Sequence, residues 1–239
     1  MKEIIKPVHL QLKKGDVSKC VLITGDPARV AEISTLLDAP RLINTYRYCV
    51  YTGKYKGKTV TLASHGMGAP SIAIAVEELH ALGGESFIRF GTCGGLTKGQ
   101  KRGDLVIPDS AHFLKGGTIG EYIGNSNKPE KPDRRLESLL LKNVNESGIA
   151  YTNGPVFSID AFYKEKESIS RFKGVNFAGV EMECATLFML ARVRKFKAAA
   201  LLLVVDNPRY NMPFLPIQTI RELGKDSASL VLDTLAGFK

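Results

Sequence analysis

Short apolar runs alternate along the chain with longer stretches in which apolar residues recur at helical spacing. The run at 20–25 has the length of a buried strand, whereas residues 70–82 place their apolar side chains on one helical face. This alternation predicts βα units and a largely parallel sheet. We predict strands at 20–25, 47–52, 58–64, 86–91, 103–108, 150–157, 176–182 and 198–206, and helices at 27–37, 70–82, 133–147, 184–195 and 216–236.

One polar stretch interrupts this pattern. Residues 115–132 are rich in glycine and proline but are too short to link two domains. We interpret them as a mobile excursion near a site or a subunit contact. No internal repeat or low-complexity segment is visible. With 239 residues, 44% of them hydrophobic, the chain can fill the core of one large α/β domain or of two small ones.

Composition narrows the class of protein. No stretch of about 18 apolar residues exists, and residues 1–6 lack the apolar segment of a signal peptide. We therefore expect a cytoplasmic protein that makes no membrane contact. The four cysteines have no C-x-x-C spacing and lie in or beside apolar runs, which favours buried free thiols over a metal site or disulfides.

The net charge is +9, from 33 basic and 24 acidic residues. Such a charge suits nucleic acids, membrane surfaces or anionic substrates. The basic residues are dispersed, however, and are dense only at 98–102 and 192–197, the second of which ends a predicted helix where cations are favoured. Because no nucleic-acid-binding module is visible, we expect no nucleic-acid partner.

Two carboxylates follow an apolar run at 177–178. If 177–182 is a strand and 184–195 a helix, Glu181 and Glu183 share one strand face at the carboxyl edge of the sheet. Ligands bind at that edge in open α/β sheets. Two carboxylates there suit sugar hydroxyls, a metal or a cationic transition state. An acidic pair is also favoured at a helix N-terminus by the macrodipole, so both readings stay open.

Two strands run into glycine turns that carry an arginine. The first turn holds Gly25, an Asp26 suited to cap a helix, a proline at a first helical position, and Arg29. The second places Arg89 beside the glycine-rich segment 91–95, which carries Thr92. Backbone N–H groups at a helix N-terminus together with a guanidinium form an anion site. The two turns therefore predict a phosphate-binding site.

Six segments in a fixed order extend this pattern from about Pro7 to the last helix. They are GDPARV at 25–30, SHGMGAPS at 64–71, RFGTCGGL at 89–96, FSIDAFY at 157–163, GVEMECATL at 179–187 and VVDN at 204–207. The chain thus resembles the nucleoside phosphorylases of the purine nucleoside phosphorylase and uridine phosphorylase type. In that family, phosphate attacks the anomeric carbon of a nucleoside and releases the base and ribose 1-phosphate.

The resemblance implies a fold and an assembly. It implies one α/β domain over 1–239, in three α/β/α layers around a central mixed, partly barrel-like sheet. It also implies a homohexamer, a trimer of dimers whose sites are shared between subunits. Inorganic phosphate is expected as a co-substrate, and no cofactor or metal is expected, because no His/Cys/Asp cluster has metal-ligand spacing.

For phosphate, the candidate ligands are the backbone of Gly25, the side chains of Arg29 and Arg89, and Thr92. The resemblance adds Arg47 as a third arginine, supplied by a neighbouring subunit. It likewise implies that His9 reaches the ribose 5′-hydroxyl of the partner. From the residues alone, both would be ordinary surface side chains.

For ribose, the resemblance implies a position over Met182 and Glu183, with Glu183 accepting from the 2′- and 3′-hydroxyls. A carboxylate there stabilises the oxocarbenium-like charge of the transition state. Glu181 either helps to hold the sugar or orients its neighbours. Met67 either packs beside the sugar or belongs to the core.

For the base, Phe162 matches the family aromatic that packs on it. Asp206 ends an apolar strand and matches the acid that protonates purine N7. Where uridine enzymes carry Gln and Arg, this chain has Lys166 and Ser168, which favours purine nucleosides: inosine, adenosine, guanosine or methylthioadenosine. Arg221, or else Arg209, corresponds to the arginine that assists the acid. One departure is Val205, where the purine enzymes usually have serine.

Three alternatives remain open. A uridine phosphorylase would recognise a different base. A nucleosidase would use water, although Arg29 and Arg89 argue for phosphate. A nucleoside-binding protein without turnover would need no Asp206.

Overall fold

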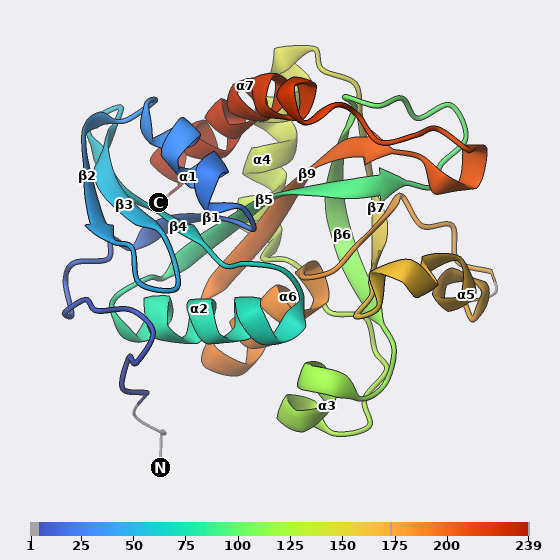
Figure 1. The fold of residues 1–239 in the computed structure, drawn as a ribbon, viewed down its shortest axis with the longest axis horizontal. Coiled ribbons are helices and arrows are strands. Elements are labelled where there is room, and N and C mark those ends of the chain that lie inside the picture. The colour runs from blue at the N-terminus through green and yellow to red at the C-terminus, as the bar shows by residue number, and fades with distance from the viewer. Residues whose placement is uncertain (1–4, 173, 239) are drawn as a thin grey trace.

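The computed structural model describes residues 5–172 and 174–238, and its described strands form one mixed sheet (Figure 1). The strand order is β2-β3-β4-β1-β5-β8-β7-β6-β9, with a further pairing between β5 and β9. The strands are β1 (Cys20–Thr24), β2 (Asp38–Asn44), β3 (Val50–Tyr55), β4 (Lys58–Ser64), β5 (Ser86–Gly95), β6 (Leu105–Phe113), β7 (Tyr151–Ser158), β8 (Gly179–Glu181) and β9 (Lys197–Asp206).

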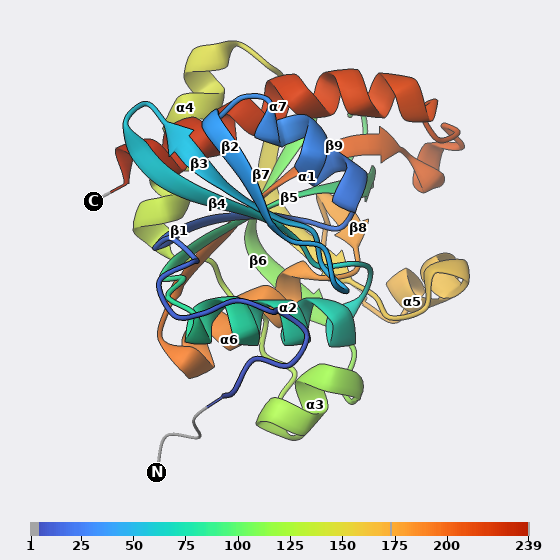
Figure 2. The ribbon, with the colours of Figure 1, turned by 60° about the vertical axis from the view of Figure 1, so that its left-hand side comes forward.

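The sheet is partly closed. Strand β5 pairs with β1, β8 and β9, so β5, β8, β7, β6 and β9 form a ring, while β1 to β4 extend from it as an open sheet (Figure 2). Strands β1, β4, β5 and β9 run parallel, whereas β2 and β3 pair antiparallel. The predicted mixed, partly barrel-like α/β fold is therefore confirmed.

Helices cover both sides of the sheet. In Figures 1 and 2, α1, α4 and α7 lie on one side, and α2, α3 and α6 lie on the other. The helices are α1 (Pro27–Ser34), α2 (Ala69–Ala81), α3 (Gly117–Ile123), α4 (Arg134–Ser147), α5 (Glu165–Ser170), α6 (Cys184–Arg194) and α7 (Ile217–Gly237), with short 3₁₀ turns η1 (Phe162–Lys164) and η2 (Pro208–Tyr210).

Helix α4 shows how local sequence produces these layers. Asp133 caps its N-terminus by accepting from two backbone N–H groups, and Gly148 ends it in the left-handed conformation at φ 73°. Leu136, Leu140 and Val144 recur every four residues and are fully buried in the core shared with α7. The 3.6-residue period therefore places one apolar stripe against the sheet and α7.

Three elements escaped the sequence prediction: β2, α3 and α5. Strand β2 is an edge strand whose side chains are largely exposed, so it lacks the alternation of a half-buried strand. Helices α3 and α5 have 7 and 6 residues, too few for a periodic signal. Helix α3 lies inside 115–132, the segment that we interpreted as an excursion.

Some boundaries also differ. The predicted strand at 47–52 begins only at Val50, because Arg47 has a positive φ of 61°. Strand β5 continues through the glycine-rich segment to Gly95, where we expected a turn after residue 91.

All four cysteines are free thiols, and three are buried. Among the described residues, none of the helices combines the length and apolar character that a membrane span requires.

The topology brings distant segments to one edge of the sheet. Strands β1, β5 and β9 are parallel neighbours, so their carboxyl ends lie together. Helix α1 begins directly after β1, and α6 begins after β8, which pairs antiparallel with the end of β5; the starts of both helices line one cavity there. Such an edge is the usual binding position in open α/β sheets.

Candidate active site

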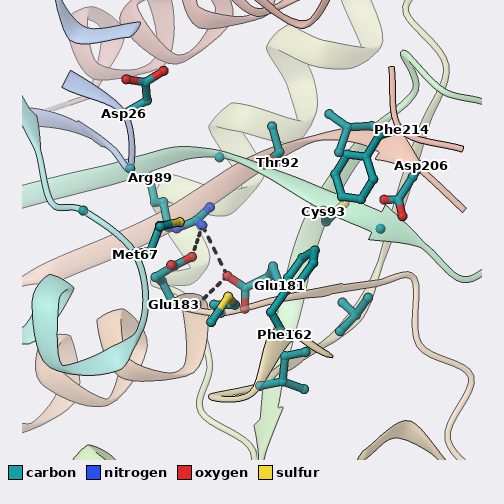
Figure 3. A pocket seen from close by; sticks show the side chains of 18 of the residues that line it. Asp26, Met67, Arg89, Thr92, Cys93, Phe162, Glu181, Glu183, Asp206 and Phe214 are labelled. Carbon is teal, nitrogen blue, oxygen red and sulfur yellow. Dashed lines mark hydrogen bonds and ion pairs between the residues drawn. The ribbon is translucent and has the colours of Figure 1, made fainter. Parts of the chain in front are cut away.

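A cavity of about 580 Å³ lies at this edge. Figure 3 shows Arg89 and Glu183 near one end and Asp206 with Phe214 at the other, with Glu181 and Phe162 between them. Ten of the predicted site residues line the cavity: Gly25, Arg29, Met67, Arg89, Thr92, Phe162, Glu181, Met182, Glu183 and Asp206.

The turn after β1 forms part of the cationic end. Asp26 caps α1 by accepting from the N–H of Ala28 at 2.8 Å, and Pro27 occupies the first turn, as predicted. A Cβ on Gly25 would lie 3.0 Å from the carbonyl oxygen of Gly66, so this close approach favours glycine. Arg29 extends into the cavity, 3.5 Å from the hydroxyl of Thr24. Burial lowers its pKa, but a guanidinium remains a cation at neutral pH.

Arg89 is the second cation and is only 4% exposed. Its Nη2 donates to the Glu183 carboxylate and lies 3.6 Å from Oε2 of Glu181. Burial alone would lower the pKa of Arg89, but the charges of Glu183 and Glu181 outweigh it and hold the pKa above its usual range. Its Nε and Nη1 are buried and have no partner among the described residues. These two donors are therefore available to an anionic ligand.

Gly91 allows this position of Arg89. Residues 89 and 91 share one face of β5, and a Cβ on Gly91 would lie 1.5 Å from Nη1 of Arg89. The guanidinium therefore folds over the Gly91 backbone, where no other residue fits without displacing it. The glycine-rich segment thus makes room for a side chain rather than forming a turn.

Glu181 is held by backbone donors. Its carboxylate accepts from the N–H of Glu183 at 2.8 Å and from the N–H of Cys184 at 2.9 Å, which are the cap residue and the first residue of α6. The hydroxyl of Ser158 donates to it as well and in turn accepts from the N–H of Ala185 at 2.9 Å. With its lone pairs engaged in this way, Glu181 orients the start of α6 and the neighbouring side chains.

Glu183 faces the cavity from a different element than expected. Strand β8 ends at Glu181, and Glu183 is the residue that precedes α6, so the two carboxylates do not share a strand face. They approach each other because both lie near Arg89. Glu183 also accepts from the N–H of Gly68 at 2.6 Å. Burial would raise its pKa, but the charge of Arg89 more than compensates and lowers it, so Glu183 is an anion.

His65 lies buried behind this group. Burial lowers its pKa to about 3, and the charge of Arg89 acts in the same direction. Neither ring nitrogen has a partner among the described residues. A neutral imidazole therefore adds no third positive charge beside Arg29 and Arg89.

The opposite end of the cavity is acidic. Asp206 is the last residue of β9, and burial raises the pKa of its carboxyl group. No described residue forms an ion pair with it. A Cβ on Gly94 would lie 3.1 Å from its Oδ1, so glycine keeps space beside the carboxyl group. An acid with a raised pKa at the end of a buried strand is suited to donate a proton to a ligand.

Aromatic rings flank this end. Phe162 lies in η1, and Phe214 lies in the segment before α7; their ring centroids are 6.2 Å apart. Both are about half exposed and line the cavity. The exposed face of such a ring is suited to pack against a flat heterocycle.

Sequence analysis missed Phe214 and Glu165, which also line the cavity. Glu165 begins α5, three residues after Phe162. That spacing, one helical turn after a predicted base-binding aromatic, is the signal that could have found it.

Four predicted residues lie elsewhere. His9 Nδ1 contacts Glu78 Oε1 at 2.8 Å, and Arg47 packs over Tyr46. Arg221 pairs with Glu32 at 3.2 Å. Arg209 reaches the carbonyl oxygen of Leu96 at 3.4 Å and lines a neighbouring cavity. The structure thus brings neither arginine to Asp206, and the roles assigned to these four residues stay predictions.

Metal ligands form no cluster in the described part of the chain: no group of three or more His, Cys, Asp or Glu side chains there is arranged to hold an ion.

Known proteins resemble the whole of this architecture. A family model described as the phosphorylase superfamily matches residues 19–236. The guanosine phosphorylase of Halorubrum lacusprofundi is 37% identical, over 84% of each chain. The uridine phosphorylase of Thermococcus kodakarensis is 35% identical, over 83% of this chain and 76% of that protein. The DeoD-type purine nucleoside phosphorylase of Mycoplasma genitalium is 39% identical, over 83% of this chain and 86% of that protein.

A solved structure from the same class of enzyme has a similar fold. The crystal structure of uridine phosphorylase from Vibrio fischeri superposes with a TM-score of 0.86 at 29% identity, and the match covers 99% of both chains.

Proposed function

We propose that this chain, which belongs to the phosphorylase superfamily, is a pentosyltransferase that cleaves nucleosides with inorganic phosphate. The products are a free base and a pentose 1-phosphate. The observation that carries this function is the polarity of one cavity: two arginines at one end, a carboxylate in the middle, and an acid beside aromatic rings at the other end. That order matches phosphate, ribose and base.

Phosphate fits the cationic end. Arg29 and the two unpartnered nitrogens of Arg89 supply charge-assisted donors, and the backbone at Gly25 and the hydroxyl of Thr92 add neutral ones. The ion pair with Glu183 holds Arg89 in place before phosphate arrives. Phosphate is thus positioned for attack without a cofactor or metal.

The reaction exchanges one bond for another. A phosphate oxygen forms a bond to C1′ while the bond from C1′ to the base nitrogen breaks, and its electron pair moves onto the base. Positive charge develops on the sugar, where Glu183 stabilises it and also accepts from the 2′- and 3′-hydroxyls. Met67 and Met182 cover the sugar. Asp206 donates a proton to N7 of a purine, which neutralises the leaving base.

Purine nucleosides are the favoured substrates: inosine, adenosine, guanosine and methylthioadenosine. The support is Asp206, because uracil has no N7 to protonate. Uridine is the alternative substrate, favoured by the names of the Thermococcus relative and the Vibrio structure. Against uridine stand Lys166 and Ser168, which replace the Gln and Arg expected for uracil recognition.

The active assembly that we propose is a cytoplasmic homohexamer, a trimer of dimers. Its support is the position of His9 and Arg47, which lie outside the cavity and would complete a neighbour's site. Glu78 holds the segment of His9 through the N–H groups of Val8, His9 and Leu10, at 2.8–3.0 Å. Within the described part of the chain no hydrogen bond engages Nε2 of the imidazole, which would contact a second subunit's ligand.

Base release from inosine, adenosine, guanosine, methylthioadenosine and uridine tests the function. We expect turnover only with phosphate or arsenate, no loss on adding a chelator, and faster cleavage of purine nucleosides than of uridine. Full activity without phosphate would identify a nucleosidase. Binding without turnover would identify a nucleoside-binding protein.

A further inference from the structure

Glu165 has no role in the reaction described above, although it lines the same cavity as Asp206. Its Oε1 is buried and has no hydrogen-bond partner among the described residues. Buried acceptors are normally paired, so an unpartnered one at a ligand cavity needs an explanation. A donor on the ligand would supply it.

Its neighbour on the same helix behaves differently. Glu167 pairs with Lys164 at 3.2 Å and with Arg171 at 3.4 Å on the surface. Glu165 forms no such ion pair in the described part of the chain. An acid that turns from the surface cations of its own helix towards a cavity is placed to contact what the cavity binds.

The two acids of the cavity influence each other. Burial, together with the negative charge of Asp206, raises the pKa of Glu165 to about 7, while Lys166 acts in the opposite direction. Burial also raises the pKa of Asp206. Ionisation of one of these acids therefore disfavours ionisation of the other.

A ligand decides which acid keeps the proton. If a purine N7 accepts from Asp206, the proton lies on Asp206 and Glu165 carries the charge. An ionised carboxylate accepts two parallel hydrogen bonds and donates none. The complementary base edge therefore presents two adjacent N–H donors.

We propose that Glu165 determines base specificity by accepting from N1–H and the 2-amino group of a 2-amino-6-oxopurine, so that guanine nucleosides are the preferred substrates. This inference rests on the function proposed above. Hypoxanthine offers the N1–H alone. Adenine presents an unprotonated N1, an acceptor that an ionised Glu165 repels. Uracil offers a single N–H between two carbonyl groups.

The experiment crosses substrates with variants. Guanosine and inosine differ only in the 2-amino group, so the ratio of their kcat/KM values isolates the contact. In the wild-type protein, we expect guanosine to exceed inosine, and inosine to exceed adenosine. Glu165→Gln replaces one acceptor with a donor, so the guanosine-to-inosine ratio should fall about 10-fold or more, as for a lost hydrogen bond to a charged group. Glu167→Gln, on the same helix, should leave the ratio unchanged.

If Glu165 had a merely structural role, Glu165→Gln would lower kcat/KM equally for guanosine and inosine. An unchanged ratio of the two values would overturn the proposal. Product inhibition provides a second measurement that needs no variant: guanine should inhibit the wild-type protein at least several-fold more strongly than hypoxanthine, and equal inhibition would contradict it. These outcomes can be distinguished from a failure of the proposed function. If no nucleoside releases its base with phosphate, the proposed function is wrong; if turnover is normal but the ratio does not respond, only the role of Glu165 is wrong.

Discussion

At the cationic end of the cavity, Arg29 and Arg89 extend from helix α1 and strand β5, whereas at the acidic end Phe162 and Phe214 belong to short connecting segments. Arg89 is 4% exposed and tied to two carboxylates, but Phe162 and Phe214 are 45% and 55% exposed. The cationic end is therefore more preorganised than the acidic end.

This difference corresponds to two chemical tasks. Phosphate and the charged sugar transition state require fixed charges, which a rigid sheet provides. In the proposed reaction, the base contacts the segments at 162–170 and 207–216, which can change without rebuilding the sheet. A scaffold of this kind can therefore keep one reaction while its base preference changes.

Replacement of Arg89 tests the rigid end and has the largest expected effect. Arg89→Ala removes a phosphate ligand and leaves Glu183 and Glu181 as buried, unpaired charges. We expect kcat/KM for phosphate to fall about 10³-fold or more, and the free energy of unfolding to fall by about 3–5 kcal/mol. Steady-state kinetics and urea unfolding measure both. Arg171→Ala, which removes a surface ion pair, should change either quantity little. Unaltered phosphate dependence in Arg89→Ala would exclude Arg89 from the phosphate site.

Replacement of Asp206 tests the acidic end. Asp206→Asn keeps the size of the side chain but removes the proton donor, so phosphorolysis of inosine and guanosine should fall about 10²–10⁴-fold. With 7-methylguanosine, whose base is already cationic, the loss should be much smaller. Spectrophotometric assays with the three nucleosides measure this contrast. Equal losses for all three would show that Asp206 acts through structure and not through proton transfer.

Replacement of Gly91 tests the position of the Arg89 guanidinium without removing the side chain. In Gly91→Ala the new Cβ would lie 1.5 Å from Nη1, so the guanidinium must move away. A displacement of this size costs about 10²-fold in kcat/KM. Gly120→Ala is the control, because a Cβ there meets nothing within 4 Å and needs no positive φ. If Gly91→Ala keeps the activity of Gly120→Ala, the observed position of Arg89 is not the active one.

The buried imidazole at the cationic end gives the smallest effect, a dependence of stability on pH. His65 has a pKa of about 3 in the folded protein and about 6.5 when unfolded, so between these values the unfolded state binds more protons. Its contribution is fully present above pH 6.5 and is lost as the pH falls, at up to about 1.4 kcal/mol per pH unit. Urea unfolding at pH 7.0, 6.0 and 5.0 should show a steeper decline for the wild-type protein than for His65→Gln. Parallel declines would refute the low pKa.

Much of the cationic end was predictable because its signals are local. Asp26, Pro27 and Arg29 lie within four residues of one another, so capping, helix start and the projecting cation can be deduced from adjacent positions. The alternation of strands and helices is also local, and it predicted the α/β class, which the sheet confirms. That one domain spans 1–239 stays a prediction.

Other features depended on the tertiary structure. Arg89 and Glu183 are 94 residues apart, and only the pairing of β5 with β8 brings them together. Glu165 and Asp206 line one cavity although they belong to α5 and β9, and α5 is too short to be recognised from its sequence. The sequence by itself determined the elements and the chemical groups they carry, since these depend on neighbouring residues. The tertiary structure decided which groups share a cavity, since that depends on long-range packing and on closure of the sheet.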